Sequence, residues 1–577
     1  MTQVVYRRKH YPRKTWVVGG LIGGLLLIIS AITLLLYPFA SKEKVAFFQG
    51  NHPILFNGRQ AGNAIIDGDK VYVSLAFLQK NIDSHIRLDE KSNSIIITTK
   101  DKVVQMPSDS LTYFINDQPV SLPFSPIKNS DSKLYIAVEP LLSFYPIQYK
   151  ILSDRNAIWI LQNGDKYSDG IVKDQDINRE KLRLRTEPTL RSPYTAEVSK
   201  KEAVYIEGEK DHFYFVRKRN GMSGYIQKNY VKQGKVHKIT ITNEIRNYQL
   251  PNMKRPINLT WEAVYTRNPD VAKITEMPGL NVISPTWFSL GGEDGSIHNL
   301  ASIDYSHWAK QRGYQVWGLF SNSFDPELTG KVFKDFDTRK NIIKRLLQYS
   351  QMYQLQGINF DIENVNPEDG PLVTQFIREA VPYLHEAGLV VSMDVTFSTG
   401  SSSNNWSSFY ERAKLSDVVD YLVIMAYDEH TAANGPGSVA SLPWVENNLR
   451  KLLQEVPEKK LILGVPLYAR LWKEQTTANG GTELTSKALT MEQVKTWLAE
   501  KGIHPVYDEE TGQNYAEYIA TNENATYKIW IEDELSLKKR IDLSLKYKLA
   551  GVASWSRSFG DPTAWTALDI SKMVVQK

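Results

Sequence analysis

The spacing of apolar and polar residues changes along the chain and divides it into five regions. A basic tail over residues 1–14 precedes an uncharged, mostly apolar stretch over 15–39. Residues 45–163 carry an internal repeat, and residues 168–234 contain short alternating runs between turn signals. Over 240–577, longer apolar runs alternate with stretches of helical periodicity. The pattern predicts a multidomain protein whose last region is the largest.

The last region contains eight apolar runs of strand length. Their alternation with helical stretches is typical of a parallel sheet built from βα units. Eight such strands predict a (β/α)₈ barrel, also called a TIM barrel. The gap over residues 471–547, between the seventh and eighth runs, predicts an α+β insertion. The eight runs are 257–265, 281–290, 315–320, 357–363, 390–397, 421–427, 460–468 and 551–555.

Residues 45–163 repeat with an offset of 63 positions, each unit having the pattern strand, short helix, strand. The matching strand segments are 70–73 with 133–136, and 94–97 with 157–160. This resembles the paired units of the copper amine oxidase N-terminal-like domain and predicts a repeated α+β domain. His52 and His85 form no ligand cluster, so no metal is expected there.

Residues 168–234 resemble the bacterial Src-homology-three-like domain throughout. The resemblance rests on segments 182–188, 204–208, 213–216 and 224–226. It implies a small all-β barrel, and such domains commonly bind cell-wall peptides. The alternative is that the aromatic residues only fill the core of the barrel.

Residues 15–39 predict one transmembrane helix. From Trp16 to Tyr37 the chain runs for 22 residues without a charge, which is long enough to span a bilayer. The five basic residues before position 15 favour a cytoplasmic N-terminus. We therefore expect a single-pass protein of a bacterial cell membrane, with its catalytic domain outside at the cell wall. A cleaved signal peptide is the alternative, although residues 38–40 make a poor cleavage site.

Composition narrows the classes of function. The net charge is +5, and the N-terminal tail supplies all of it, so the rest of the chain is neutral and nucleic-acid binding is disfavoured. The chain has no cysteine, which excludes disulfides, thiolate metal sites and cysteine nucleophiles. Phosphate-binding loops, zinc-protease helices and serine-hydrolase elbows are absent from the sequence. We therefore expect neither a cofactor nor a metal.

One segment, residues 356–364, carries the chemistry. Side chains alternate along a strand, so Asn359, Asp361 and Glu363 share one face and the intervening apolar residues share the other. Burying an amide and two carboxyls costs several kcal/mol unless these groups are hydrogen-bonded or take part in binding or catalysis. Glu363 ends the run, at the edge where barrel active sites lie.

This segment resembles the D-G-x-D-x-D-x-E signature of family 18 glycoside hydrolases, and most closely their peptidoglycan- and spore-cortex-acting branch. Three further motifs follow in the family's order, at residues 425–428, 464–470 and 551–555. Two acids of the signature are replaced, by Gln356 and Asn359. Peptidoglycan-acting relatives commonly carry Asn at the second position.

The resemblance implies substrate-assisted retaining catalysis, in which the N-acetyl group of the sugar attacks C1. Glu363 would be the acid and then the base. Asp361 would hold the acetamido N–H, and Tyr427 would hydrogen-bond the acetamido carbonyl. Further substrate-binding residues are expected at Asn359, Met425, Asp428, Trp555, Tyr468 and Arg470.

We therefore expect cleavage of β-1,4 bonds in an N-acetylglucosamine polymer, with peptidoglycan favoured over chitin. A non-catalytic, lectin-like wall protein is one alternative, and a wall scaffold acting through residues 45–234 is another. Asp394, Glu532 and Asp533 are weaker candidates that we expect to be structural.

Overall fold

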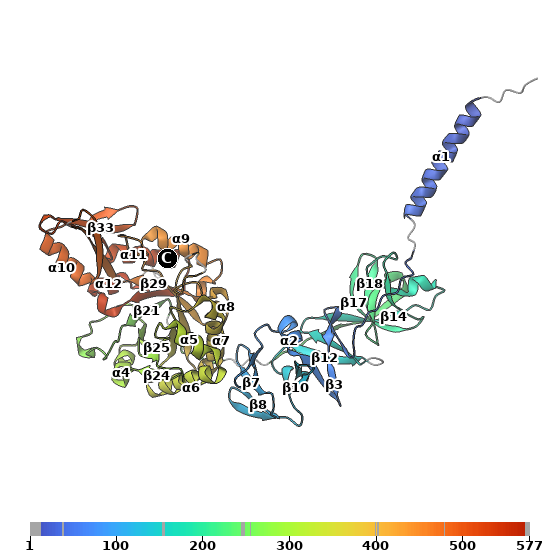
Figure 1. The fold of residues 1–577 in the computed structure, drawn as a ribbon, viewed down its shortest axis with the longest axis horizontal. Helices are drawn as coiled ribbons and strands as arrows, with labels where there is room; N and C mark the ends of the chain where they lie inside the picture. The colour runs from blue at the N-terminus through green and yellow to red at the C-terminus, as the bar shows by residue number, and fades with distance from the viewer. Residues whose placement is uncertain are drawn as a thin grey trace, which may run out of the picture. The chain divides into compact units, whose positions relative to one another are not determined.

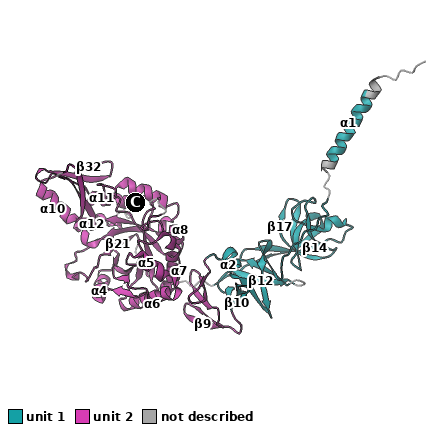
Figure 2. Cartoon of the chain, viewed as in Figure 1, with its two compact units in different colours: residues 1–84, 126–244 teal, residues 85–125, 245–577 magenta. Residues whose placement is uncertain are grey.

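The computed structural model describes residues 13–36, 40–152, 156–243, 248–253, 255–398, 400, 403–477 and 479–571. Two compact units make up the chain (Figure 2). The first unit contains residues 1–84 and 126–244, and the second contains residues 85–125 and 245–577.

An N-terminal helix, α1 (Arg13–Leu36), occupies most of the stretch predicted to span a membrane. Within the part of the chain that the structure describes, no helix is both long enough and apolar enough to cross a bilayer. The predicted transmembrane helix over 15–39 is therefore not supported.

The repeat over 45–163 appears as two similar strand–helix pairs. Strand β4 (Lys70–Ser74) leads into α2 (Leu75–Asn81), and β11 (Lys133–Ala137) leads into α3 (Val138–Leu141). The two strands pair antiparallel, with Val73 opposite its repeat partner Ile136. Two four-stranded sheets result, in the orders β12-β13-β1-β2 and β10-β11-β4-β3. The other strands are β1 (Pro53–Phe56), β2 (Arg59–Asn63), β3 (Ile65–Asp67), β10 (Ile127–Ser130), β12 (Ile147–Leu152) and β13 (Ala157–Gln162).

Residues 166–238 form one seven-stranded antiparallel sheet around its own apolar core. The alternation of buried and exposed positions along β17 places Val204 and Ile206 in that core, as the sequence pattern predicts. The sheet order is β16-β15-β19-β18-β17-β14-β20. The strands are β14 (Lys166–Val172), β15 (Arg183–Arg185), β16 (Tyr194–Glu197), β17 (Ala203–Lys210), β18 (Phe213–Lys218), β19 (Ser223–Gln227) and β20 (Val231–Lys238).

The second unit contains a closed barrel of eight parallel strands, which confirms the predicted (β/α)₈ fold (Figure 1). The pairing of β22 with β25 completes the ring. Each of the eight predicted runs contains one barrel strand. They are β21 (Ile257–Glu262), β22 (Val282–Pro285), β25 (Gln315–Ser321), β26 (Gly357–Asp361), β27 (Val390–Val395), β28 (Tyr421–Met425), β29 (Leu461–Pro466) and β35 (Gly551–Trp555).

Helices surround the barrel, and a short hairpin extends its sheet. The hairpin strands are β23 (Phe288–Leu290) and β24 (Ile297–Asn299). The helices are α4 (Ile303–Gln311), α5 (Pro326–Lys334), α6 (Phe336–Met352), α7 (Gly370–Glu386), α8 (Arg412–Val418), α9 (Leu442–Leu452), α11 (Glu534–Lys546) and α12 (Pro562–Ala567).

The barrel has two apolar cores, one between strands and helices and one inside the ring. Ile358 and Phe360 of β26 belong to the outer core, while Trp261, Trp317 and Val423 belong to the inner one. This division follows from the alternation of side chains along each strand. The residues between Ile358 and Phe360, and after Phe360, therefore face the barrel interior.

The predicted α+β insertion lies between β29 and β35. It is a five-stranded antiparallel sheet in the order β31-β30-β34-β33-β32 with one helix, α10 (Met491–Lys501), whose N-terminus has a capping box at Thr490. The strands are β30 (Tyr468–Thr476), β31 (Thr482–Thr490), β32 (Val506–Asp508), β33 (Gln513–Ala520) and β34 (Ala525–Ile531).

A separate five-stranded sheet over residues 85–125 packs against the barrel helices, although the sequence places it inside the repeated domain. Gln375 of α7 donates to the Thr98 hydroxyl at 3.3 Å, and Lys340 of α6 pairs with Asp117 at 2.9 Å. This segment therefore belongs to the compact unit of the barrel. Its strands are β5 (Arg87–Asp89), β6 (Ser94–Thr98), β7 (Val103–Pro107), β8 (Thr112–Ile115) and β9 (Gln118–Ser121).

Candidate active site

Strand β26 delivers the predicted acidic residues to the carboxyl edge of the barrel. Asn359 and Asp361 lie within the strand, and Glu363 lies two residues beyond its end. Asn359 is fully buried and Asp361 is 8% exposed, whereas Glu363 is partly open to solvent. Asn359, Asp361 and Glu363 therefore form a row of polar groups, the acidic row. It begins in the barrel interior and ends at the mouth of the barrel.

Asn359 is the centre of a hydrogen-bond network across four strands. Its amide nitrogen donates to Ser392 at 3.1 Å and to Asp394 at 2.8 Å. Its amide oxygen accepts from Trp261 at 3.0 Å and from Ser284 at 3.1 Å. Every polar atom of this buried amide is therefore paired, which fixes its orientation beneath the acidic pair.

Asp361 is buried, and one of its oxygens has no protein partner. Its Oδ1 makes no hydrogen bond with any residue that the structure describes. Burial raises the pKa of Asp361 well above its usual range, the charge of Asp394 raises it further, and a hydrogen bond with Glu363 opposes the rise. A buried carboxylate oxygen without a donor is costly, so it is a ready acceptor for an N–H of a bound molecule.

Glu363 has the properties of a proton donor. Burial raises its pKa well above the usual range, and the charges of Asp361 and Asp428 add to the rise. The hydrogen bond between the two carboxyls also raises the pKa of Glu363 while it lowers that of Asp361. The hydrogen bond therefore favours the protonated form of Glu363 and the ionised form of Asp361.

The backbone of Glu363 is held by a residue that the sequence did not single out as functional. Asn322, the residue after β25, is fully buried. Its side-chain oxygen accepts from the Glu363 amide at 3.0 Å, and its nitrogen donates to the Glu363 carbonyl at 2.7 Å. A buried amide directly after a strand was the available signal, and it marks Asn322 as a positioning residue.

Tyr427 and Trp555 lie at the ends of other barrel strands. Burial raises the pKa of Tyr427, and the charges of Asp394, Glu363 and Asp361 contribute, so its hydroxyl stays protonated beside them. Trp555 is the last residue of β35, and its ring centroid lies 6.0 Å from that of Trp261. Met425 is the last residue of β28 and is partly exposed.

Asp428 is an exposed residue with a positive φ of 60°, and two predicted substrate-binding residues hold its side chain. The Tyr468 hydroxyl donates to its Oδ1 at 2.6 Å, and Arg470 donates to the same oxygen at 2.8 Å. The three residues thus form one cluster at the start of the insertion. They contact one another and orient the Asp428 carboxylate.

The three weaker candidates, Asp394, Glu532 and Asp533, have different roles. Asp394 is buried and takes part in the network, because it accepts from Asn359 and, at 3.2 Å, from Trp261. Trp261 and Ser284 were missed, although both occupy inward positions of the first two strands. Glu532 pairs with Arg540 at 2.6 Å, and Asp533 caps α11, so both have structural roles where the insertion joins α11.

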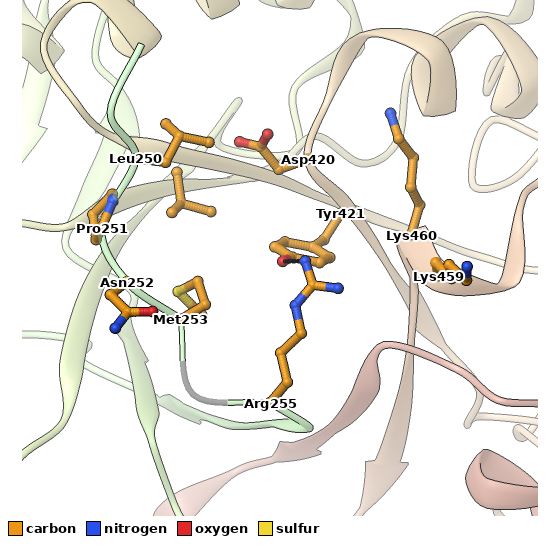
Figure 3. A pocket seen from close by; sticks show the side chains of 10 residues that line it. Leu250, Pro251, Asn252, Met253, Arg255, Asp420, Tyr421, Lys459 and Lys460 are labelled. Carbon is orange, nitrogen blue, oxygen red and sulfur yellow. Dashed lines mark hydrogen bonds between the residues drawn. The ribbon is translucent and has the colours of Figure 1, made fainter. Parts of the chain in front are cut away.

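A pocket of about 660 Å³ lies at the amino ends of the barrel strands, opposite the acidic residues. Figure 3 shows the side chains that line it. Val390 and Tyr421, the first residues of β27 and β28, line it, together with Arg255, which donates to the Tyr421 hydroxyl at 2.9 Å. The acidic row lies at the carboxyl ends of the strands, so this pocket is separate from it. Among the described residues, no three His, Asp or Glu side chains are grouped to hold a metal ion.

Two families match parts of the chain. Glycosyl hydrolases family 18 matches residues 285–560, and the copper amine oxidase N-terminal domain matches residues 55–147. The match to family 18 includes six of the eight barrel strands in full, the last residue of β22, and the polar residues of β26 together with Glu363.

Three relatives illustrate the similarity. The chain is 25% identical over 296 residues to the uncharacterized glycosylase YvbX of Bacillus subtilis, covering 50% of this chain and 84% of that protein. It is 25% identical to the cortical fragment-lytic enzyme of Bacillus subtilis, covering 45% of this chain and 60% of that enzyme. The solved spore cortex-lytic enzyme SleL of Bacillus megaterium QM B1551 aligns with a TM-score of 0.49 and 20% identity, covering 59% of this chain and 77% of SleL.

Proposed function

Because this chain contains a family 18 glycoside hydrolase domain, we propose that it cleaves β-1,4 bonds in peptidoglycan by substrate-assisted retaining catalysis. The observation that carries the proposal is the Asp361–Glu363 pair, in which burial raises the pKa of Glu363 and the buried Oδ1 of Asp361 has no hydrogen-bond partner among the described residues. A relative named for lysis of cortical fragments supports the choice of a wall polysaccharide.

The other carboxylates near the site already have partners. Asp394 accepts from Asn359 and Trp261, and Asp428 is bound by Tyr468 and Arg470. A conventional retaining enzyme needs a free carboxylate on the side of the glycosidic bond opposite the acid. The acid and Asp361 come from the same strand, so the nucleophile must come from the substrate.

In the proposed reaction, the N-acetyl oxygen on C2 attacks C1 as Glu363 gives its proton to the leaving oxygen. Asp361 accepts the acetamido N–H through its free oxygen and stabilises the positive oxazolinium intermediate. Tyr427 donates to the acetamido oxygen and orients it, and such intramolecular positioning is worth about 7 kcal/mol or more. Glu363 then removes a proton from water, which attacks C1 and restores the original configuration.

The test of this function is mass spectrometry of fragments released from purified sacculi. We expect new reducing ends on N-acetylglucosamine, retained configuration, and no cleavage once that residue is de-N-acetylated. A sugar trapped covalently on an enzyme carboxylate would contradict the mechanism. Faster cleavage of chitin than of sacculi would support the alternative that the protein is a chitinase. Binding without cleavage would favour the lectin-like alternative.

We further propose that the catalytic domain works outside the cytoplasm, at the bacterial cell wall. A wall polysaccharide as substrate supports this location, since the glycan is assembled outside the membrane. Protease added to intact, wall-stripped cells should degrade the barrel. Fractionation of the same cells tests attachment to the membrane independently, and protection of the barrel would contradict the location.

A further inference from the structure

A second pocket, of about 750 Å³, lies where the sheet over residues 85–125 packs against the barrel helices. Strand β5 and the turn after it form one wall, and residues of α5, α6 and α7 form the other. Both walls belong to the same compact unit (Figure 2). The pocket shares no lining residue with the acidic row or with the pocket shown in Figure 3, so the proposed reaction does not use it.

Five basic residues line this pocket, and three of them are paired with a carboxylate. These pairs are Lys91 with Asp335, Lys331 with Glu293, and Arg339 with Glu379. The other two, Arg87 on β5 and Lys334 at the end of α5, have no carboxylate within ion-pair distance in the part of the chain that the structure describes. The pocket therefore contains two positive charges without a direct counter-charge.

Arg87 is partly buried, which makes its unbalanced charge costly. Burial lowers the pKa of its guanidinium and the charge of Arg339 lowers it further, while the charges of Glu379 and Glu411 oppose this change. Both acids already pair with other cations, Glu379 with Arg339 and Glu411 with Lys414. A partly buried cation without its own partner costs free energy, and a bound anion would offset that cost.

The acidic residue nearest to Arg87 along the strand, Asp89, is bound by neutral donors. Its Oδ1 accepts from the Phe336 amide at 3.1 Å, and its Oδ2 accepts from the amide and the hydroxyl of Ser92 at 2.9 and 2.6 Å. Asp89 therefore fastens the turn after β5 to the start of α6. It does not form an ion pair with Arg87.

Strand β5 is the edge strand of its sheet, which has the order β5-β6-β7-β8-β9. It pairs with β6, with Arg87 opposite Ile96, and its second edge pairs with no strand among residues that the structure describes. Leu88, between Arg87 and Asp89, is 38% exposed. A free strand edge offers backbone N–H and C=O groups to an extended peptide, and an exposed leucine offers apolar contact.

We propose that this pocket binds an acidic peptide, whose extended backbone lies along β5 and whose carboxylate pairs with Arg87 and Lys334. A guanidinium presents two parallel N–H groups that match the two oxygens of a carboxylate. Acetate and inorganic phosphate would meet the same cations, but they could not pair with the strand edge. The proposal goes beyond the proposed function, because peptide binding at this pocket does not require cleavage of a glycan.

Titration of the full chain with synthetic peptides tests the pocket. The probe is acetyl-Ala-Glu-Ala-amide, which has one carboxylate, and acetyl-Ala-Gln-Ala-amide is its neutral match. We expect the acidic peptide to bind about tenfold more tightly, because its carboxylate forms charge-assisted hydrogen bonds. A version of the acidic peptide that is N-methylated along its backbone should bind weakly, since it cannot donate to β5.

Two variants locate the binding site. Arg87→Gln should abolish the preference for the acidic peptide, and Lys334→Gln, at an exposed position, should weaken its binding about threefold. Arg450→Gln is the matched control, since Arg450 is exposed on α9 and does not line the pocket, and it should leave binding unchanged.

Thermal unfolding without peptide distinguishes a binding residue from a structural one. Arg87→Gln removes an unbalanced charge, so its melting temperature should equal or exceed that of the wild type. A lower melting temperature would assign Arg87 to the packing of the sheet and contradict its role in binding, while Lys334→Gln still tests the pocket in a folded protein.

Three binding results would overturn the proposal. They are equal affinity for the acidic and neutral peptides, unchanged affinity in both pocket variants, and binding of acetate or inorganic phosphate as tightly as the acidic peptide. Failure of the chain to cleave sacculi would refute the proposed function alone, because the peptide titrations do not depend on turnover.

Discussion

Two clusters of buried charge in the barrel unit differ in what neutralises them. Between α6 and α7, Arg339 donates to both oxygens of Glu379 at 2.7 and 2.8 Å, and both side chains are almost fully buried. In the acidic site of the barrel, Asp361 interacts with Glu363 and Asp394, and Asp394 accepts from two neutral donors, Asn359 and Trp261. The first cluster is balanced by a cation, whereas burial in the second favours the protonated forms of its carboxyls.

The difference separates a structural carboxylate from a chemical one. Burial lowers the pKa of Arg339, but the charge of Glu379, its hydrogen bonds with Arg339 and the charges of two nearby aspartates together outweigh burial and raise that pKa. In the acidic row, burial raises the pKa of Glu363 and Asp361 instead. A pair of the first kind stabilises the packing of two helices, whereas the second kind stores a transferable proton at the mouth of a barrel.

The largest expected effect comes from removing the stored proton. Glu363→Gln should reduce kcat by about 10²–10⁴-fold, because the amide keeps the shape of the side chain and cannot transfer the proton. Assays on purified sacculi measure the loss. Glu368→Gln is the matched control, since Glu368 is exposed five residues further along the same segment. Near-normal turnover by a folded Glu363→Gln protein would mean that the acid lies elsewhere.

The corresponding change in the ion pair should affect stability instead. Glu379→Gln leaves Arg339 buried without its counter-charge and should lower the free energy of unfolding by about 3–5 kcal/mol. Denaturant titration of the barrel unit measures this, and the folded fraction should keep its specific activity. A variant with full stability would show that the pair is not needed for helix packing.

The acidic row should respond to the same type of change with increased stability. The folded pKa of Glu363 is raised above its ordinary value of 4.5, so its contribution to stability is complete below that pH and is lost as pH rises through the folded pKa. Because glutamine does not ionise, the Glu363→Gln variant does not lose this stability as the pH rises. Its melting temperature should exceed that of the wild type at neutral pH, and the gain should disappear below about pH 4.5. A gain in melting temperature that persists in acid would contradict the raised pKa of Glu363.

The smallest expected effect concerns the alkaline limb of the rate profile. The charge of Asp428 helps to raise the pKa of Glu363, so Asp428→Asn should lower that pKa. Because the protonated form of Glu363 is the active acid, the alkaline limb of kcat should move to lower pH. Measuring kcat at saturating substrate separates this shift from weaker binding. Movement to higher pH would exclude the electrostatic role.

The sequence alone predicted those features of the fold that depend on the local spacing of apolar and polar residues. The alternation over 357–363 predicted that Ile358 and Phe360 face the helices and that Asn359 and Asp361 face the interior, and the two cores of the barrel confirm this. All eight strands and the insertion were also predicted. Asp394 was underestimated, because its significance depends on contacts with Asn359 and Trp261, which come from other strands.

By itself, the sequence determined the period of the apolar residues, the order of the barrel motifs and the residue types at the carboxyl ends of the strands. Only the tertiary structure decided which polar groups meet, because closure of the ring brings Trp261 and Ser284 of the first two strands against Asn359 of the fourth. It also decided that the sheet over 85–125 packs on α6 and α7. Such contacts depend on register and closure across the whole chain, and no local spacing of residues records them.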